Sequence, residues 1–477
     1  MIISGFNEYW LGPHVRVQAC AEWEQVERDR VFPAFEAPAD APVTLKAEPN
    51  AFLAAAYVPA WNAGESRLRV SERICPVLWD RLLAVGVMLE HWYPEMGPPP
   101  VIEAQATETY KPNEHKSFSL LSCGVDSLCT IWRNYQFYPR DHPRAVDSAV
   151  TIFFSRLPPN RAVTSTSEQR QVEQKCGNVC RDLGMASIPV WTNLMELEPN
   201  GFVFSYKWHG AALSCVTHCF ADQESRLSIA SSSDYTHLKP WGSHPMLDPL
   251  YGSANLDIEH DAARLTRFAK TQAICEWQAA LDNLRVCQGR QVAGINCGSC
   301  EKCIRTKTAL VALNALARSA AFIDDDLPPD LLKTVAEYEM LSNVGQLSYY
   351  EALCPALRQA GRDDLARTID EIVYYYKRSY GGSNAGQSDQ YPSEPFLVAD
   401  DATFGGPVIE GHGHYWGQPD NGAQAIAQLS ALKRVGYRIL LMPKGSWWPE
   451  YFTGLTDYLE ACGERGTSGN FHWYRLD

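Results

Sequence analysis

Four cysteines lie close together just past the middle of the chain, and they constrain what this stretch can fold into. Cys287, Cys297, Cys300 and Cys303 follow the spacing C-x9-C-G-x-C-x2-C. Three of the thiolates fall within one tight turn, which Gly298 allows the backbone to make, and the fourth arrives from a short loop. Two disulfides or four free thiols are the alternatives, although Cys297 and Cys300 are too close for comfortable bridging. The spacing predicts a structural zinc site with four sulfur ligands and no open coordination position.

A second motif lies upstream, where a short apolar run leads into a turn of small residues and then into a helical pattern. The turn is Ser122-Cys123-Gly124-Val125-Asp126-Ser127. A small-residue turn that opens a helix exposes unpaired backbone N–H groups at the positive end of the helix dipole, which suits a phosphate group. Ser122 and Ser127 can add hydroxyl donors, and Asp126 can orient the turn or help to hold Mg²⁺. A plain helix cap rich in Ser and Asp is the alternative.

The two motifs together resemble those of one enzyme superfamily. The turn SCGVDS resembles the Ser-Gly-Gly-x-Asp-Ser loop of the ATP pyrophosphatase (PP-loop) superfamily. CGSCEKC, after a fourth cysteine, resembles the zinc knuckle of its 7-cyano-7-deazaguanine synthase branch. The segments Ser228–Leu250 and Ile258–Ile274 are similar to distant, longer relatives of that synthase. The resemblance covers Ser117–Ala317, under half of the chain, and Cys123 departs from it by replacing the first glycine of the family loop.

The resemblance implies an enzyme that binds ATP and Mg²⁺, cleaves ATP between the α and β phosphates, and activates a carboxylate as its adenylate. In the deazaguanine synthase, ammonia displaces AMP from adenylated 7-carboxy-7-deazaguanine, and a second adenylation dehydrates the amide to the nitrile. The protein mainly positions the reactants and neutralises charge. The loop residues 122–127 would bind the nucleotide, with Asp126 and Ser127 catalytic. Arg267 and Lys270, at i and i+3, would neutralise the leaving pyrophosphate, unless they form an ordinary solvated basic face.

Several further polar residues are open candidates. Asp234, Trp241, Ser243 and His244 either contact substrate or ribose, or form a plain polar loop. His209 opens a predicted helix, where a cap or core role competes with proton transfer.

Two patterns near the C-terminal end are weaker. Glu410, His412 and His414 have the spacing E-x-H-x-H, but no fourth metal ligand is visible and the intervening glycines indicate a loop. Trp447 and Trp448 either form a protein-binding or sugar-stacking face, or pack in the core of a small domain.

Composition restricts the class of protein further. The chain has 477 residues, enough for about three domains, and 45% of them are hydrophobic, as in globular proteins. A net charge of −14 disfavours nucleic acid as a partner. No apolar run approaches the ~20 residues needed to span a bilayer, and the first residues do not resemble a signal peptide. We therefore expect a cytoplasmic protein with reduced thiols and no membrane segment.

The order of patterns predicts an α/β protein with several regions. These are a β-rich or α/β accessory domain (1–113), a PP-loop nucleotide-binding domain with the zinc knuckle (114–310), a helical extension (311–380), a linker (381–400) and a small α/β domain (401–477). Strand candidates are 117–121, 148–154, 187–192, 226–231 and 437–442, and helix candidates include 77–92, 364–380, 423–435 and 450–461. In the central region their alternation predicts a doubly wound parallel sheet, with the phosphate loop at the carboxyl end of its first strand.

Three functions stay open. We favour a ligase that passes an adenylated deazaguanine, or a related carboxylate, to a nitrogen nucleophile. The nucleophile could be an amine of a partner protein docked by the N- or C-terminal domain, as the resemblance to relatives in bacterial antiviral defence implies. A 7-cyano-7-deazaguanine synthase of queuosine-type biosynthesis is the second function, although it should not need the additional domains. The third is a nucleotide-binding scaffold or sensor inactivated by Cys123, and a homodimer is compatible with all three.

The consequence of Cys123 depends on the conformation of its backbone. We expect its thiol to point away from the phosphate and its position not to need a positive φ. Replacement by glycine would then change ATP affinity little.

Overall fold

The computed structural model describes most of the first 333 residues and shorter stretches beyond them. The described residues are 1–106, 116–220, 226–287, 296–333, 349–380, 396–398, 423, 426, 429, 439–443, 453–468 and 471–475. Contacts within the chain divide it into two compact units. The first unit contains Met1–Glu198, Val203–Cys297 and Ala317–Asp325, and the second contains Pro199–Phe202, Gly298–Leu316 and Asp326–Asp477.

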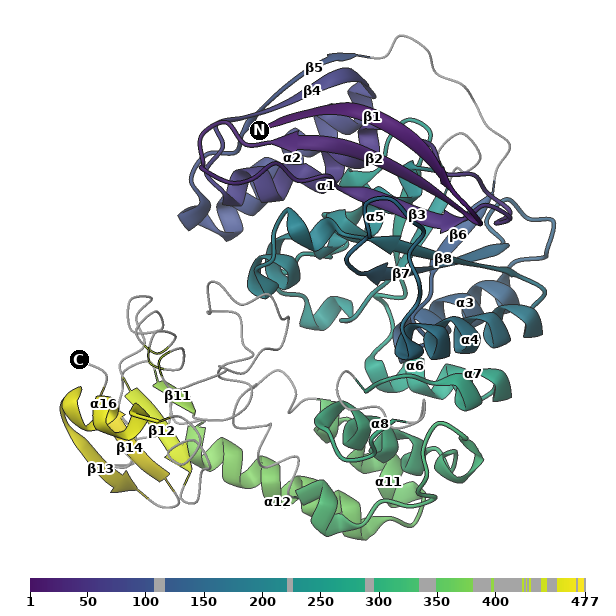
Figure 1. The fold of residues 1–477 in the computed structure, drawn as a ribbon. Coiled ribbons are helices and arrows are strands. Elements are labelled where there is room, and N and C mark those ends of the chain that lie inside the picture. Colours follow the sequence, from purple (N-terminus) through teal and green to yellow (C-terminus); the bar gives the residue numbers. More distant parts are fainter. Residues whose placement is uncertain are drawn as a thin grey trace. The chain divides into compact units, whose positions relative to one another are not determined.

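One ten-stranded sheet forms the centre of the first unit (Figure 1). Its order is β10-β9-β6-β7-β8-β3-β2-β1-β4-β5. The strands are β1 (Ile2–Leu11), β2 (His14–Glu22), β3 (Ala34–Pro38), β4 (Arg67–Ile74), β5 (Val101–Ala106), β6 (Ser117–Leu120), β7 (Ser148–Phe154), β8 (Ala186–Thr192), β9 (Arg226–Ala230) and β10 (Asp257–Asp261). Neighbouring strands from β10 to β8 are parallel, whereas β3 joins β8 in antiparallel orientation. The predicted α/β class with a largely parallel sheet is therefore confirmed.

The strands β6 to β10 are wound in two directions. Along the chain, β6, β7 and β8 extend the sheet one way, and the chain then returns to place β9 and β10 on the other side of β6. The direction of winding therefore switches between β6 and β9, and open α/β sheets bind ligands beyond the carboxyl ends of the strands at such a point. The four strands predicted in this region are confirmed to within one residue at each end.

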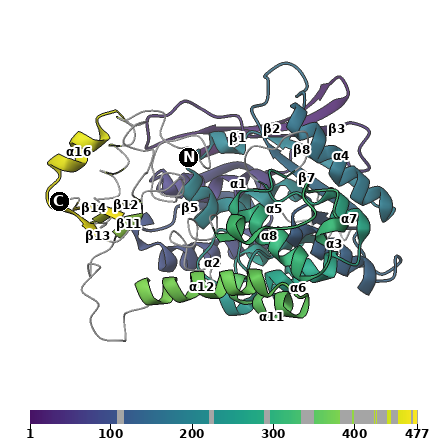
Figure 2. The ribbon, with the colours of Figure 1, turned by 90° about the horizontal axis from the view of Figure 1, so that it is seen from below.

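Helices cover both faces of the sheet (Figures 1 and 2). On one face lie α1 (Pro49–Asn62), α2 (Pro76–Trp92) and α5 (His209–His218), and on the other lie α3 (Val125–Phe137), α4 (Ser167–Asp182), α6 (Arg267–Ile274) and α7 (Gln278–Asn283). The predicted helix 77–92 is confirmed as α2. By contrast, α1 is buried all round from Asn50 to Trp61. It therefore lacks the amphipathic period by which a surface helix is identified from sequence.

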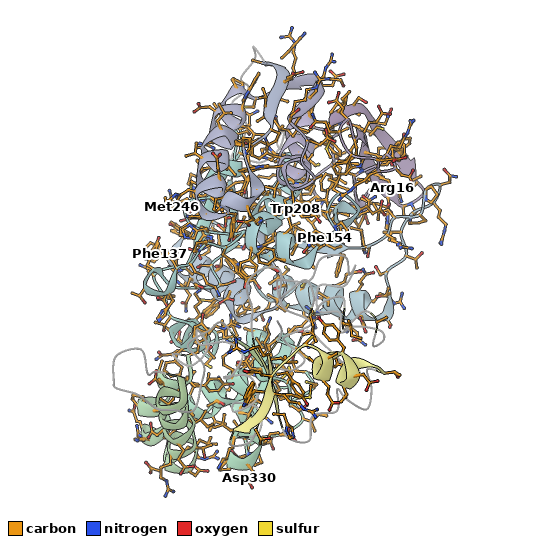
Figure 3. The ribbon with its side chains drawn as sticks, turned by 90° about the vertical axis from the view of Figure 1, so that its left-hand side faces the viewer. Arg16, Phe137, Phe154, Trp208, Met246 and Asp330 are labelled. Atoms are coloured by element: carbon orange, nitrogen blue, oxygen red, sulfur yellow. The ribbon has the colours of Figure 1, made fainter. Side chains whose placement is uncertain are left out.

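Short helical turns complete the first unit. They are η1 (Pro94–Met96), η2 (Leu194–Glu196), η3 (Val203–Trp208), η4 (Tyr235–His237) and η5 (Asp248–Tyr251). η3 is a π-helix that runs directly into α5. Its Phe204 contacts Phe154 at the end of β7 and Trp208 within η3, with ring centroids 5.2 and 5.9 Å apart. Phe204 thus lies between Phe154, at the end of β7, and Trp208, which directly precedes α5. Figure 3 labels Phe154 and Trp208.

The N-terminal region, predicted as an accessory domain over residues 1–113, shares its sheet with the central region. β3 pairs with β8 through Phe35 and Thr192 and through Glu36 and Trp191. Alternation along one strand does not reveal which strand it will pair with, so this junction was not visible in the sequence. The N-terminal strands belong to the same compact unit as the predicted phosphate loop.

The second unit contains helices and a small sheet. Its described elements are α8 (Glu301–Ala312), α11 (Cys354–Gln359), α12 (Asp363–Tyr380), β11 (Phe396–Val398), β12 (Ile439–Pro443), α16 (Leu455–Ala461), β13 (Arg465–Ser468) and β14 (Phe471–Arg475). The strands form the order β11-β12-β14-β13. α12, β12 and α16 confirm the helix predicted at 364–380, the strand at 437–442 and the end of the helix at 450–461. β11 falls within the predicted linker, whose residues 381–395 lie outside the described part, as does most of the helix predicted at 423–435.

The described helices differ from membrane-spanning helices in length and composition. Within these parts of the chain, none combines the length and the apolar composition needed to cross a bilayer.

Candidate functional site

The predicted phosphate loop connects β6 to α3 at the carboxyl end of β6, as expected. Gly124 is the N-cap of α3, and the buried Val125 is its first residue. Ser127 Oγ accepts a hydrogen bond from Ser122 N at 3.3 Å and lies 3.3 Å from Ser122 Oγ. The two hydroxyl groups therefore meet beside the N-terminus of a 13-residue helix. This arrangement offers an anion both hydroxyl donors and the positive end of a helix dipole.

Cys123 adopts a left-handed backbone conformation, with a φ of 57°. The expectation that this position does not need a positive φ is therefore wrong. Its thiol is fully buried and lies 3.5 Å from Cys176 Sγ of α4, and Cys123 is not among the described residues that line the cavity beside the loop. The orientation of the thiol relative to a bound phosphate stays a prediction. Hydrogen bonding to Cys176 and burial raise the pKa of the Cys123 thiol.

Asp126, in the first turn of α3, forms ion pairs with both predicted basic residues of α6. Arg267 Nη1 contacts Asp126 Oδ2, and Lys270 Nζ lies 3.6 Å from Asp126 Oδ1. Lys270 is fully buried and also donates a hydrogen bond to Ser231 O at 2.5 Å. Burial lowers the pKa of Lys270, and the negative charge of Asp126 opposes this shift. Lys270 is thus not part of a solvated basic face, and the two cations meet at the loop.

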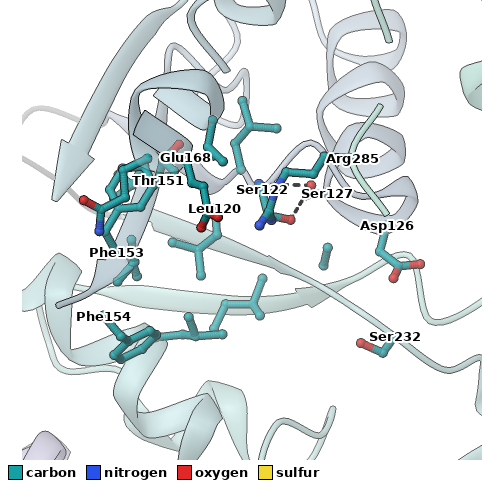
Figure 4. A pocket seen from close by; sticks show the side chains of 18 residues that line it. Leu120, Ser122, Asp126, Ser127, Thr151, Phe153, Phe154, Glu168, Ser232 and Arg285 are labelled. Atoms are coloured by element: carbon teal, nitrogen blue, oxygen red, sulfur yellow. Dashed lines mark hydrogen bonds between the residues drawn. The ribbon is translucent and has the colours of Figure 1, made fainter. Parts of the chain in front are cut away.

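A cavity of about 500 Å³ opens beside the loop (Figure 4). Its walls come from the ends of β6, β7 and β9, from the first turn of α4 and from the segment that follows α7. Polar side chains that line it include Ser122, Asp126, Ser127, Thr151, Glu168 and Arg285. Small-molecule sites typically have volumes of roughly 300–1,000 Å³. The cavity is therefore large enough for a nucleotide-sized ligand at the point where the sheet changes its direction of winding.

Ser243 and His244 belong to a buried polar cluster around Asp248. Ser243 Oγ donates to Asp248 Oδ2 at 2.7 Å, and His244 N donates to Asp248 Oδ1 at 3.2 Å. His260 Nδ1 of β10 lies 2.7 Å from Asp248 Oδ2. The aspartate thus fixes the loop before η5, and neither Ser243 nor His244 is among the described residues that line the cavity.

The other polar candidates also make contacts within the fold. Asp234 Oδ1 accepts a hydrogen bond from Thr236 N at 2.9 Å and caps η4. The Trp241 ring packs edge-on against Tyr206, with centroids 4.5 Å apart. His209 opens α5, as predicted, and its Nδ1 lies 2.9 Å from Ser205 O. Burial lowers the pKa of His209. These contacts favour a packing or capping role for all three residues.

The four predicted metal-binding cysteines come together. The sulfur atoms of Cys287, Cys297, Cys300 and Cys303 all lie within 4.8 Å of one another. Gly298 has a φ of 76°, as the predicted tight turn requires. Cys300 is the N-cap of α8 and Cys303 lies in its first turn, where the helix dipole stabilises negative charge. The cluster is therefore placed to bind a metal such as zinc.

Two residues near the cysteines, Arg285 and Asn296, were not identified as site residues from the sequence. Arg285 lines the cavity. The side chain of Asn296 accepts hydrogen bonds from Val286 N at 2.9 Å and Cys287 N at 3.1 Å, and it donates to Leu284 O at 3.0 Å. The available signal was their position, because residues that flank metal ligands often orient the site.

Some sequence candidates cannot be placed. Glu410, His412, His414, Trp447 and Trp448 lie outside the described residues.

No protein-family model matches the chain, and comparisons with curated proteins and with solved structures also gave no significant match.

Proposed function

We propose that the protein is an ATP-dependent enzyme of the PP-loop class, which cleaves ATP to AMP and pyrophosphate and activates a carboxylate for C–N bond formation. The main support is the position of the loop 122–127 at the carboxyl end of β6, beside a cavity at the switch of winding direction. The chain also lacks the G-x-x-x-x-G-K-[ST] pattern of P-loop enzymes that transfer the γ-phosphate.

Different residues at the loop could bind the phosphates, hold Mg²⁺ and neutralise the leaving group. Backbone N–H groups at the start of α3, with Ser122 and Ser127, would bind the phosphates. Asp126 Oδ1 is buried and has no hydrogen-bond partner among the described residues, which fits a ligand of Mg²⁺. Bound Mg²⁺ would neutralise charge on the phosphate oxygens. Arg267 and Lys270, which pair with Asp126, could turn to the leaving pyrophosphate once Asp126 holds the cation.

The substrate follows from the sequence resemblance rather than from the shape of the cavity. We propose 7-carboxy-7-deazaguanine or a related carboxylate, with a nitrogen nucleophile such as an amine of a partner protein. With ammonia as the nucleophile, the same chemistry would make the chain a 7-cyano-7-deazaguanine synthase.

A scaffold or sensor that binds nucleotide without turnover is the second candidate function. One observation favours it, namely the left-handed backbone of Cys123 at a position where the superfamily has glycine. Such a conformation costs a non-glycine residue about 1–2 kcal/mol.

The metal in the cysteine cluster is proposed to be zinc with a structural role. Four thiolates fill a tetrahedral shell and leave no position for a substrate. The cluster needs reduced thiols, which supports a cytoplasmic location.

Nucleotide products test the proposed function directly. Purified protein incubated with ATP, Mg²⁺ and candidate acids should release AMP and pyrophosphate, separated by chromatography. Asp126→Asn should lower the rate by about 10²-fold or more, because the carboxylate that would hold Mg²⁺ at the phosphates is lost. Asp147→Asn is the control, because Asp147 is exposed and immediately precedes β7, at the opposite end of the strands. Release of ADP would refute the proposal, and binding of ATP without any product would favour the scaffold.

A further inference from the structure

Arg285 places a positive charge in the wall of the cavity, which also carries the carboxylates of Asp126 and Glu168. It is the only lysine or arginine among the described residues that line it. Asp126, which also lines the cavity, is already paired with Arg267 and Lys270. Arg285 Nε is buried without a hydrogen-bond partner, and within the described parts of the chain Arg285 forms no ion pair. A buried donor left without a partner is costly, so a ligand that accepts its hydrogen bonds is expected.

The main chain of Arg285 lies directly against the phosphate loop. Its N–H group donates to Cys123 O at 2.7 Å, and a Cβ atom added to Gly124 would lie 3.8 Å from Arg285 O. Figure 4 shows the Arg285 side chain beside Ser122 and Ser127. A guanidinium group binds phosphate through two parallel hydrogen bonds. Its position next to two hydroxyls and a helix N-terminus therefore selects an anionic ligand with several oxygens.

The main chain around Arg285 is held in place by Asn296 and by the nearby metal-binding cysteines. Asn296, which is 4% exposed, hydrogen-bonds the main chain on both sides of Arg285, at Leu284 O and at Val286 N. Cys287 follows two residues later and belongs to the cluster, and Asn296 itself precedes the next member, Cys297. The same stretch is thus held by an asparagine side chain and by the metal-binding cysteines. This arrangement keeps the arginine at the loop without placing it in a helix or strand.

We propose that Arg285 is a phosphate-binding residue of this cavity and that Asn296, together with the cysteine cluster, positions it. The proposal rests on the proposed function, because it names a further ligand for the phosphates of the same nucleotide. It also gives the cluster a role at the site, because Cys287 and Asn296 hold the main chain around Arg285 next to the loop.

Calorimetric titration with inorganic pyrophosphate and with a non-hydrolysable ATP analogue tests Arg285. Arg285→Gln should weaken the binding of both by about tenfold or more, because a charged hydrogen-bond donor is lost. Arg285→Lys should recover part of the affinity, because it keeps the charge but not the planar fork. Arg181→Gln is the matched control, because Arg181 is exposed near the C-terminal end of α4, whereas the first turn of that helix lines the cavity.

A double-variant cycle tests Asn296. Asn296→Ala should weaken pyrophosphate binding in the wild-type background and have little further effect in Arg285→Gln, because a residue that acts only through Arg285 is not additive with it. A general structural defect would lower affinity equally in both backgrounds. Circular dichroism should show that all variants are folded.

Each result has a distinct meaning. Unchanged binding of both ligands by Arg285→Gln would overturn the role of Arg285. Full additivity of the two substitutions would overturn the positioning role of Asn296. If wild-type protein bound neither pyrophosphate nor the ATP analogue, the proposed function would fail first, and this inference with it.

Discussion

Cys123 shows how one residue can combine unfavourable and favourable contributions. Its φ of 57° is a conformation in which an L side chain meets the following carbonyl oxygen. Its carbonyl oxygen accepts the hydrogen bond from Arg285 N, and its thiol packs against Cys176. The surrounding contacts therefore hold a strained backbone at the point where the loop meets the cysteine segment.

Two substitutions at this position separate the backbone strain from the packing of the thiol. Both Cys123→Gly and Cys123→Ala remove the buried sulfur, but only glycine relieves the strain. Cys123→Gly should therefore be more stable than Cys123→Ala by about 1 kcal/mol, the reverse of the usual order. Denaturant unfolding of both variants measures the difference. An alanine variant as stable as the glycine variant would show that the left-handed conformation is not strained.

Among the helices, α5 depends on an unusually close approach of two backbones. Gly210 N donates to Gly242 O at 2.8 Å. A Cβ atom at Gly210 would contact Gly242 O and would lie 2.6 Å from Asp248 Oδ1. The start of α5 therefore has no room for a side chain where it meets the loop that holds Ser243 and His244.

Gly210→Ala should destabilise the protein by about 1–3 kcal/mol, because the backbone of the loop has to move. Gly177→Ala in α4 is the matched control. A Cβ atom there would meet only Arg181 Nη1 at 3.8 Å, so alanine should be neutral or stabilising through its helix propensity. Thermal unfolding of the two variants compares them, and equal stability would contradict the close approach.

We expect the folding of α8 to depend on a metal ion bound by the cysteine cluster. Purified protein should carry about one zinc ion per chain, because four thiolates bind zinc with an apparent free energy on the order of 10 kcal/mol or more. Cys300→Ser should lose the ion and unfold the helices next to it. Elemental analysis and circular dichroism measure both effects, with Cys20→Ser in β2 as the control outside the cluster. The absence of zinc, or unchanged stability of Cys300→Ser, would refute a structural zinc site.

At the scale of the whole first unit, a buried ion pair between two N-terminal strands also forms hydrogen bonds with the central region. Arg16 Nε of β2 donates to Glu36 Oε2 of β3 at 2.8 Å, and both side chains are almost fully buried. Glu36 Oε1 accepts from Val163 N at 2.7 Å, and Arg16 Nη1 donates to Pro158 O at 2.7 Å. The pair therefore anchors the segment that leads into α4, whose first turn lines the cavity.

Glu36→Ala should lower the free energy of unfolding by about 3–5 kcal/mol, because it leaves Arg16 as a buried, unpaired charge. Glu22→Ala on β2 is the control. Its ion pair with Arg30 is exposed, so its removal should cost less than about 1 kcal/mol. Urea unfolding monitored by tryptophan fluorescence compares the two variants. Similar costs for both would show that the buried pair contributes no more to stability than the exposed pair.

Local patterns and long-range pairing differ in how far the sequence predicts them. The strand 148–154, the helix 364–380 and the four cysteines are marked by neighbouring residues, and the structure confirms them. The pairing of Phe35 with Thr192 depends on residues far apart in the chain, and no local period indicates it. The nearby cysteines mark the neighbourhood of Arg285, but its contact with Cys123 spans most of the central region and has no local pattern.

β10, the last strand of the described sheet on the side of β9, has consequences for how the protein behaves at high concentration. Its outer edge carries backbone groups that could pair with a strand of another molecule. The sequence DIEHD places Asp257, Glu259 and Asp261 at alternate positions, on one face of this strand. Arg226 pairs with Asp257 and Glu259, and Arg133 pairs with Asp261. Charged side chains of both signs would lose water if two such edges came together. The strand that ends the sheet on this side therefore discourages aggregation.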